Sequence, residues 1–301
     1  SMGSAASLTF KNCSIGGLVN ATTGNIIFNA SVFNSDVSFD KTGANNDASA
    51  GGNIFQGITN LENSGSGYLL TGNGAPDVFN DNLSLINNGT NTIHFAYNSA
   101  GNIINGDLSI QNLVGAAQVR LVDNLSTLTI NGNADILNNT TSASSQIYFG
   151  LNGSLQQNGS VTAVNSASGG TAQILFSNNS GTALSITGSL DITNNSSATN
   201  SNVYIGNQGA VNVGGQTTAV NNASGATGEI YVASGGNSTV TFTGAANFTN
   251  SNSGTTKRIW LGNDGDVIFN GVLTIANTAT STNCGVYCNY SGTSSNLYNQ
   301  N

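Results

Sequence analysis

Aromatic side chains recur at the centre of a repeated apolar-aromatic-apolar tripeptide, as in Ile147-Tyr148-Phe149 and Val203-Tyr204-Ile205. In a strand, successive side chains point to opposite sides, so buried flanking residues place the aromatic residue outward. An outward aromatic stripe could bind a glycan or a protein through its large contact area, or could stabilise neighbouring strands by stacking. The candidate binding residues are Tyr148, Tyr204, Tyr231, Trp260 and Tyr287.

The chain has few groups for acid-base or nucleophilic catalysis. His94 is the single histidine, and 5 Lys and Arg stand against 13 Asp and Glu. Asp264 and Asp266 could form a carboxylate pair, but aspartates beside glycine are typical turn residues. The sequence contains no phosphate-binding loop, nucleophile elbow or metal-ligand spacing. We therefore expect no enzyme, cofactor or metal site. The alternative, a polysaccharide-cleaving enzyme, requires paired carboxylates beside a basic residue.

The three cysteines are too few for a disulfide scaffold. Cys13 lies far from the other two along a stacked chain, whereas Cys284 and Cys288 are close in sequence. These two residues could form a local disulfide bond, remain as thiols or, least expected, bind a metal.

The tripeptide establishes the architecture. Its copies begin at residues 93, 119, 147, 174, 203, 230, 259 and 286, at intervals of 26 to 29. A glycine recurs at the same period, preceded by an apolar residue and followed by alternating apolar residues, as in Leu190 and Ile192. Each repeat thus contains three short strands separated by turns. The pattern predicts an all-β, right-handed parallel β-helix of about ten coils, each of 22 to 29 residues.

Asparagine recurs six residues after the glycine, on the same side of the strand as the buried apolar residues. A buried amide needs partners for two donors and an acceptor, and a stack of identical amides supplies them. We expect a structural ladder at one corner of each coil, formed by Asn63, Asn87, Asn112, Asn138, Asn165, Asn194, Asn221, Asn250 and Asn277.

Composition narrows the possible partners. Only 6% of residues are charged and the net charge is -8, so the chain lacks the basic stripe that nucleic-acid binding requires. No apolar stretch approaches the length of about 20 residues that spans a membrane. Hydrophobic residues make up 38% and alternate regularly, which argues against disorder. Threonines are too irregular for the flat array of an ice-binding face.

The repeat suggests three regions along the chain. Residues 1–7 are typical of a vector-derived scar, and residues 8–52 fit the repeat poorly, as expected for atypical N-terminal coils or a cap. Lys41, for example, stands where the pattern calls for asparagine. Residues 53–301 read as regular coils that stop in mid-coil, so we expect a segment of a longer protein.

The entry Ile268-Phe269-Asn270-Gly271, with alternating Leu-x-Ile-x-Asn and turns of Asn, Gly, Ser and Thr, resembles the β-strand repeats of secreted bacterial surface proteins. It looks like the passenger rods of autotransporter-type adhesins and the repeat arrays of gliding bacteria. The resemblance implies an extracellular, non-enzymatic rod in an adhesin or filament at the bacterial cell surface. The implied partners are other segments or copies of the same protein, a glycan, or a host or prey cell surface. No functional residue is implied.

Overall fold

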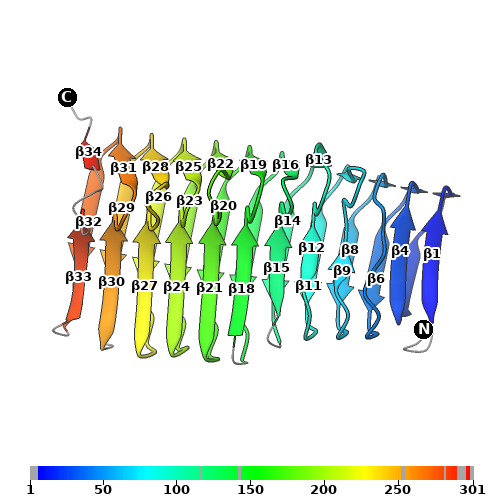
Figure 1. The fold of residues 1–301 in the computed structure, drawn as a ribbon, viewed down its shortest axis with the longest axis horizontal. Coiled ribbons are helices and arrows are strands. Elements are labelled where there is room, and N and C mark those ends of the chain that lie inside the picture. Colours follow the sequence, from blue (N-terminus) through cyan, green and yellow to red (C-terminus); the bar gives the residue numbers. More distant parts are fainter. Residues whose placement is uncertain are drawn as a thin grey trace.

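The computed structural model describes residues 6–114, 117–141, 144–251, 255–280, 283–289 and 296–298. Within these ranges the chain forms strands and no helix. Figure 1 shows the strands side by side along a rod, with β1 at one end and β33 and β34 at the other. The first five residues of the predicted scar and the last three of the chain lie outside the described residues.

Sheet 1 contains the strands that lead into the recurring glycine, and every pairing within it is parallel. Its 12 strands are β2 (Ser14–Ile15), β5 (Val32–Phe33), β7 (Ile54–Phe55), β10 (Val78–Phe79), β13 (Asn102–Ile104), β16 (Thr127–Ile130), β19 (Ser154–Gln157), β22 (Ala183–Ile186), β25 (Ala210–Val213), β28 (Thr239–Phe242), β31 (Asp266–Phe269) and β34 (Asn296–Tyr298).

Sheet 2 contains the strands that end at the recurring asparagine, again all parallel. Its 11 strands are β3 (Val19–Thr23), β6 (Val37–Lys41), β8 (Thr59–Asn63), β11 (Leu83–Asn87), β14 (Leu108–Asn112), β17 (Ala134–Asn138), β20 (Val161–Asn165), β23 (Leu190–Asn194), β26 (Thr217–Asn221), β29 (Ala246–Asn250) and β32 (Leu273–Asn277).

Sheet 3 contains the tripeptide strands in parallel register. Its 9 strands are β9 (Leu69–Leu70), β12 (Ile93–Phe95), β15 (Gln118–Leu121), β18 (Ser144–Phe149), β21 (Thr171–Phe176), β24 (Asn200–Ile205), β27 (Thr227–Val232), β30 (Thr256–Leu261) and β33 (Asn283–Cys288). The prediction of an all-β parallel β-helix with three strands per coil is confirmed. The three sheets contain 12, 11 and 9 strands, so the number of coils differs slightly from the expected ten.

The N-terminal region continues the stack but departs from its regular period. Strands β1 (Ser7–Lys11) and β4 (Asn25–Asn29) form a separate two-stranded parallel sheet. Ser7, the last residue of the predicted scar, pairs with Asn25. Ile15 pairs with Phe33 only 18 residues later, whereas Phe33 pairs with Phe55 and therefore spans a longer coil. Sheet 3 begins only at β9, but β1 and β4 lie on the same side of the rod ahead of it (Figure 1), and Gly51 bridges Asn29 of β4 to Ala75.

The interior is filled by one apolar residue above another. Near the N-terminus, Phe33, Phe55 and Phe79 of sheet 1 stack with centroid separations of 4.8 and 4.6 Å and an interplanar angle of 1° in both pairs. Further along, Ile104 and Ile130 take the same position and are fully buried. Because parallel strands repeat at about 4.8 Å, stacked identical residues pack at their ideal separation.

The recurring glycine lies where the turns of neighbouring coils approach most closely. A Cβ atom on Gly159 would lie 2.2 Å from the carbonyl oxygen of Gly132, and one on Gly271 would lie 2.3 Å from that of Gly244. No side chain tolerates such a contact, so only glycine fits at these two positions.

Candidate functional site

The outer face of sheet 3 differs from the other two faces of the rod. In sheet 2 the outward positions are mostly small and polar, for example Ser84 and Thr162. In sheet 3 the register aligns the central tripeptide residues into one outer column: His94, Arg120, Tyr148, Leu175, Tyr204, Tyr231, Trp260 and Tyr287. We call this surface the aromatic face.

Four rings of this column form a continuous stack, which we call the ring ladder: Tyr204, Tyr231, Trp260 and Tyr287. Successive centroids are 4.9, 6.3 and 4.6 Å apart, with interplanar angles of 5°, 8° and 26°. The rings therefore cover one another's faces and present their edges to solvent. Although it points outward, Trp260 is only 5% exposed. The structure thus shows strand-stabilising stacking, one of the two roles that the sequence left open.

Tyr148 stands apart from the ring ladder. Leu175, which is 4% exposed, separates it from Tyr204 in the column. The Tyr148 hydroxyl donates to Oε1 of Gln146 at 2.9 Å, and the guanidinium carbon of Arg120 lies 5.9 Å from the ring centroid. The five predicted aromatic residues therefore share one face but do not form one continuous surface.

A second outer column runs beside the rings, two residues earlier on each strand: Gln118, Gln146, Gln173, Asn202, Glu229 and Arg258. Its first three amides form their own ladder, since Gln118 Nε2 donates to Gln146 Oε1 at 2.6 Å and Gln146 Nε2 donates to Gln173 Oε1 at 2.7 Å. This column supplies hydrogen-bond partners for the polar edges of the rings.

Glu229 connects the two columns. Its carboxylate accepts hydrogen bonds from the Tyr231 hydroxyl and from Trp260 Nε1, the latter at 3.1 Å. Arg258 Nη1 lies 3.8 Å from the same carboxylate and its guanidinium lies 5.3 Å from the Trp260 centroid. Burial, together with the hydrogen bond to Glu229 and its charge, raises the pKa of Tyr231 far above its usual range, so this hydroxyl stays a donor. Glu229 therefore fixes the orientation of the ladder's central rings.

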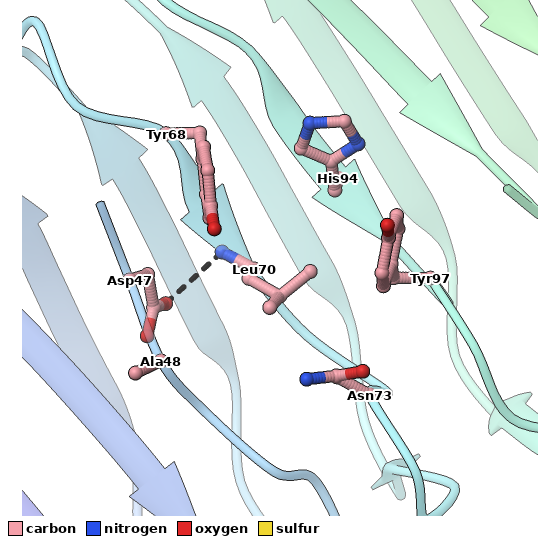
Figure 2. Close-up of a pocket in the computed structure, with 7 residues that line it drawn as sticks. All are labelled: Asp47, Ala48, Tyr68, Leu70, Asn73, His94 and Tyr97. Carbon is pink, nitrogen blue, oxygen red and sulfur yellow. Dashed lines mark hydrogen bonds between the residues drawn. The ribbon is translucent and has the colours of Figure 1, made fainter. Parts of the chain in front are cut away.

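A pocket lies at the other end of this face, where sheet 3 begins (Figure 2). Its volume is about 320 Å³. Tyr68 and Tyr97 lie on opposite sides of Leu70, and His94 lies above Leu70 in this view. Both tyrosine rings meet the His94 ring edge to face, with centroid distances of 5.4 and 5.3 Å. The remaining lining residues are Asp47, Ala48 and Asn73.

The charged groups around this pocket are held by the protein itself. Asp47 is 2% exposed; its Oδ2 accepts the backbone N–H of Leu70 at 3.0 Å, and its Oδ1 accepts the N–H of Ser49 at 2.8 Å. Burial raises the pKa of Asp47 to about 6. On the other side, His94 Nδ1 donates to Asp123 Oδ2 at 3.1 Å. Burial alone would raise the pKa of Asp123, but the bond from His94 and the nearby positive charges lower it.

The predicted asparagines are in register along the corner of sheet 2, and eight of the nine are fully buried. From Asn138 to Asn277 each Nδ2 donates to the next Oδ1 at 3.1 to 3.2 Å. Asn63, Asn87 and Asn112 are aligned but not joined in this way, and their Oδ1 atoms have no partner. The position before them is taken by Lys41, which is fully buried and donates to the Gly43 carbonyl at 3.1 Å. The bonded ladder is therefore shorter than the aligned column.

The local disulfide bond considered for Cys284 and Cys288 is wrong. Both residues lie on strand β33, paired with Lys257 and Leu261 of β30. Four residues along a strand separate two Cα atoms by about 13 Å, and a disulfide bond requires less than about 7 Å. No disulfide bond joins them.

The described residues also contain a pocket of about 230 Å³ on the outside of sheet 2, which Asp107 and Asp135 help to line. No basic residue lines it. Within the described ranges, no three His, Cys, Asp or Glu side chains are grouped as a metal site would need. The same ranges contain no helix that could cross a membrane.

Sequence patterns do not single out the pocket at Tyr68. That tyrosine precedes a strand of only two residues, Leu69–Leu70, which lacks the tripeptide pattern. The length of the coil could have revealed this pocket from the sequence, because one coil before Ile93 lies Leu69. The two residues pair, and this pairing places Leu70 beside His94. Comparisons of the chain with protein-family models, with curated proteins and with solved structures give no match.

Proposed function

We propose that this chain is a non-enzymatic rod segment of a bacterial surface adhesin or filament, located outside the cell. In this proposal the rod holds an attachment surface at a distance and stacks against other segments or copies of the same protein. Its target is a glycan or another component of a host or prey cell surface. The repeat chemistry described above supports the location, and the aromatic face supports attachment.

The observation that carries the proposal is the concentration of rings on one of three faces. Sheets 1 and 2 expose mainly hydroxyl and amide side chains, such as Thr129 and Ser109. Sheet 3 carries a column of aromatic rings, and a concave pocket with two tyrosines lies where the sheet begins. Aromatic residues are over-represented at recognition surfaces because they combine large contact area with few rotatable bonds.

The alternative is a polysaccharide-binding or polysaccharide-cleaving protein on the same fold. The carboxylates of Asp107 and Asp135 in the pocket of sheet 2 are the observation in its favour. The role that Asp107 already has argues against this alternative. Its Oδ1 accepts the N–H of Asn133 at 2.7 Å and so stabilises a turn.

Attachment can be tested with beads that carry the chain. The beads are applied under flow to surfaces coated with mucin, cellulose, chitin or peptidoglycan, and retention is compared with albumin-coated beads. We expect retention on at least one surface at a shear stress that removes the albumin beads. Equal loss of both kinds of bead from every surface would contradict the proposal.

A further inference from the structure

We infer that the pocket between Tyr68 and Tyr97 is a sugar-binding site that takes one neutral pyranose residue of a glycan. The inference rests on the proposed attachment function and names the part of the aromatic face that makes the contact. It assigns the ring ladder to stability and the pocket to recognition.

Ring geometry separates the two sets of aromatic residues. A pyranose binds an aromatic residue by placing its C–H groups against the ring face. In the ring ladder those faces are covered by neighbouring rings at 4.6 to 6.3 Å. In the pocket, Tyr68 and Tyr97 contact His94 with interplanar angles of 85° and 75°, so no other ring is stacked on them there. The pocket therefore offers tyrosine faces on which no ring is stacked, placed on two sides of one concave space.

The size of the pocket suits a single sugar residue. Its volume of about 320 Å³ lies at the lower end of the range of small-molecule sites. Leu70 forms the floor between the two tyrosines, as Figure 2 shows, and it is 5% exposed. An apolar floor between aromatic walls matches the apolar face of a pyranose.

Polar groups at the rim can bind the sugar hydroxyls. Asn73 Nδ2 donates to the Ser49 carbonyl at 3.1 Å, which leaves its Oδ1 as an acceptor. His94 uses Nδ1 for Asp123, which leaves Nε2 as the second nitrogen of the ring. The hydroxyls of Tyr68 and Tyr97 can both donate and accept. These groups supply the mixed donors and acceptors that sugar hydroxyls require.

Charge selects a neutral sugar over an acidic one. The lining contains the carboxylate of Asp47 and no lysine or arginine. Both oxygens of Asp47 already accept protein N–H groups, so it contributes charge rather than a free acceptor. A uronic or sialic acid would bring a second negative charge against it, and the lining has no lysine or arginine to pair with that charge. An organic cation is the competing ligand, because aromatic rings beside a carboxylate also attract cations.

The probes are the methyl glycosides of glucose, galactose, N-acetylglucosamine and glucuronic acid, together with choline. Each is titrated into the full chain and followed by calorimetry and by ligand-observed NMR. We expect at least one neutral glycoside to bind, and glucuronide and choline to bind at least tenfold more weakly. Tyr97→Ala should weaken neutral-sugar binding at least tenfold, whereas Tyr97→Phe, which keeps the ring, should change it less than fivefold.

Two further variants make the test decisive. Ala48→Trp fills the pocket from an exposed position and should abolish binding even if Tyr97→Ala fails to fold. Replacing Tyr204, Tyr231 and Trp260 together by Ser should leave sugar binding within twofold in a folded protein. If only this ladder variant lost sugar binding, the pocket would not be the binding site, and the glycan would bind to the ring ladder instead. Binding of choline alone, or no binding of any neutral sugar, would overturn the inference. The proposed function is tested separately, by the attachment of the beads.

Discussion

At the scale of single residues, the ladder of buried asparagines shows how a polar side chain stabilises a solenoid core. Asn194 Nδ2 donates to Asn221 Oδ1 at 3.2 Å and to the carbonyl of Ser201 at 3.1 Å, and its Oδ1 accepts from Asn165 at 3.2 Å. One side chain thus satisfies three groups that would be costly to bury alone.

Asn194→Leu should therefore lower the free energy of unfolding by roughly 1 to 3 kcal/mol, because it removes the donor to Asn221 Oδ1 and to the Ser201 carbonyl and the acceptor for one of the two bonds of Asn165 Nδ2. The matched control is Asn212→Leu, the same change at an exposed strand position of sheet 1. Urea denaturation of both variants measures the difference. Equal stability of the two variants would show that the ladder contributes nothing beyond its strand.

Buried carboxylates give the rod an unusual pH dependence. Asp77 is 2% exposed, and burial raises its pKa from 3.8 to about 6, although the N–H groups of Asn53 and Gly72 bond to its carboxylate and lower the pKa in part. Asp47 has the same raised pKa for the same reason. Between pH 4 and 6 the folded state then binds more protons than the unfolded state, so stability rises as pH falls through this window.

We expect the free energy of unfolding to be higher at pH 4.5 than at pH 7, by on the order of 4 kcal/mol for the two groups together. Asp123, whose pKa is lowered, loses its contribution only below this window. Denaturation curves across the range measure the effect, and Asp77→Asn should flatten it. A stability that falls steadily from pH 7 to 4.5 would refute the expectation.

At the scale of strands and sheets, the spacing of residues predicted the register of most coils. The tripeptides starting at residues 93 to 286 pair in sheet 3 as expected, because alternating apolar residues and a nearly constant period leave one pairing that buries every apolar side chain. Leu69–Leu70 escaped notice because two residues carry no alternation. Cys284 and Cys288 were misjudged because closeness in sequence is not closeness in an extended strand.

The candidate site was less predictable than the fold for a related reason. Sequence alignment of repeats finds positions that recur, and the ring ladder recurs. Tyr68 and Tyr97 occur once each, at positions with no counterpart in other coils, and both contact the His94 ring because β9 and β12 pair. Ring orientation, which distinguishes stacked from open faces, depends on side-chain packing and not on spacing.

Register also predicts how the rod tolerates deletion. Removing residues 203–258 joins Asn202 to Ile259, which pairs in the same register as Val203, two coils later. Because coils contact mainly their neighbours, the shortened chain should remain a folded, soluble rod. Circular dichroism and analytical ultracentrifugation measure its strand content and shape.

The control removes residues 203–257, one residue fewer. This joint shifts strand β30 by one position, which turns Ile259 outward and Arg258 inward. We expect this variant to aggregate or to melt at a clearly lower temperature than the in-register deletion. Equal stability of the two deletions would mean that the coils do not require the side-chain alternation shown by the sheets.

At the scale of the whole molecule, the three faces of the rod differ in the side chains that they carry. Sheets 1 and 2 surround the core and expose small polar residues, and sheet 3 adds a face of rings whose two ends differ. In the ring ladder, neighbouring rings cover one another's faces, and Glu229 accepts hydrogen bonds from two of the rings. The pocket at Tyr68 leaves its ring faces open. One repeat unit thus yields the body of the rod and, where the repeat is broken, the pocket that we propose as a recognition site.

This division predicts binding without turnover. Incubation of the unmodified protein with neutral and acidic polysaccharides should yield no reducing ends and no unsaturated products by chromatography and mass spectrometry. The reason is that Asp107 and Asp135 line a pocket on the outside of sheet 2 that has no basic residue in its lining. The sugar-sized pocket of sheet 3 has one carboxylate, and both of its oxygens accept backbone N–H groups. A glycosidase needs one carboxyl group free to donate a proton and a second free to attack or to activate water. If the unmodified protein forms products and Asp135→Asn does not, the enzyme alternative is correct and the proposal of a non-enzymatic rod is wrong. Asp135 suits this control because its side chain is exposed and lies outside the core.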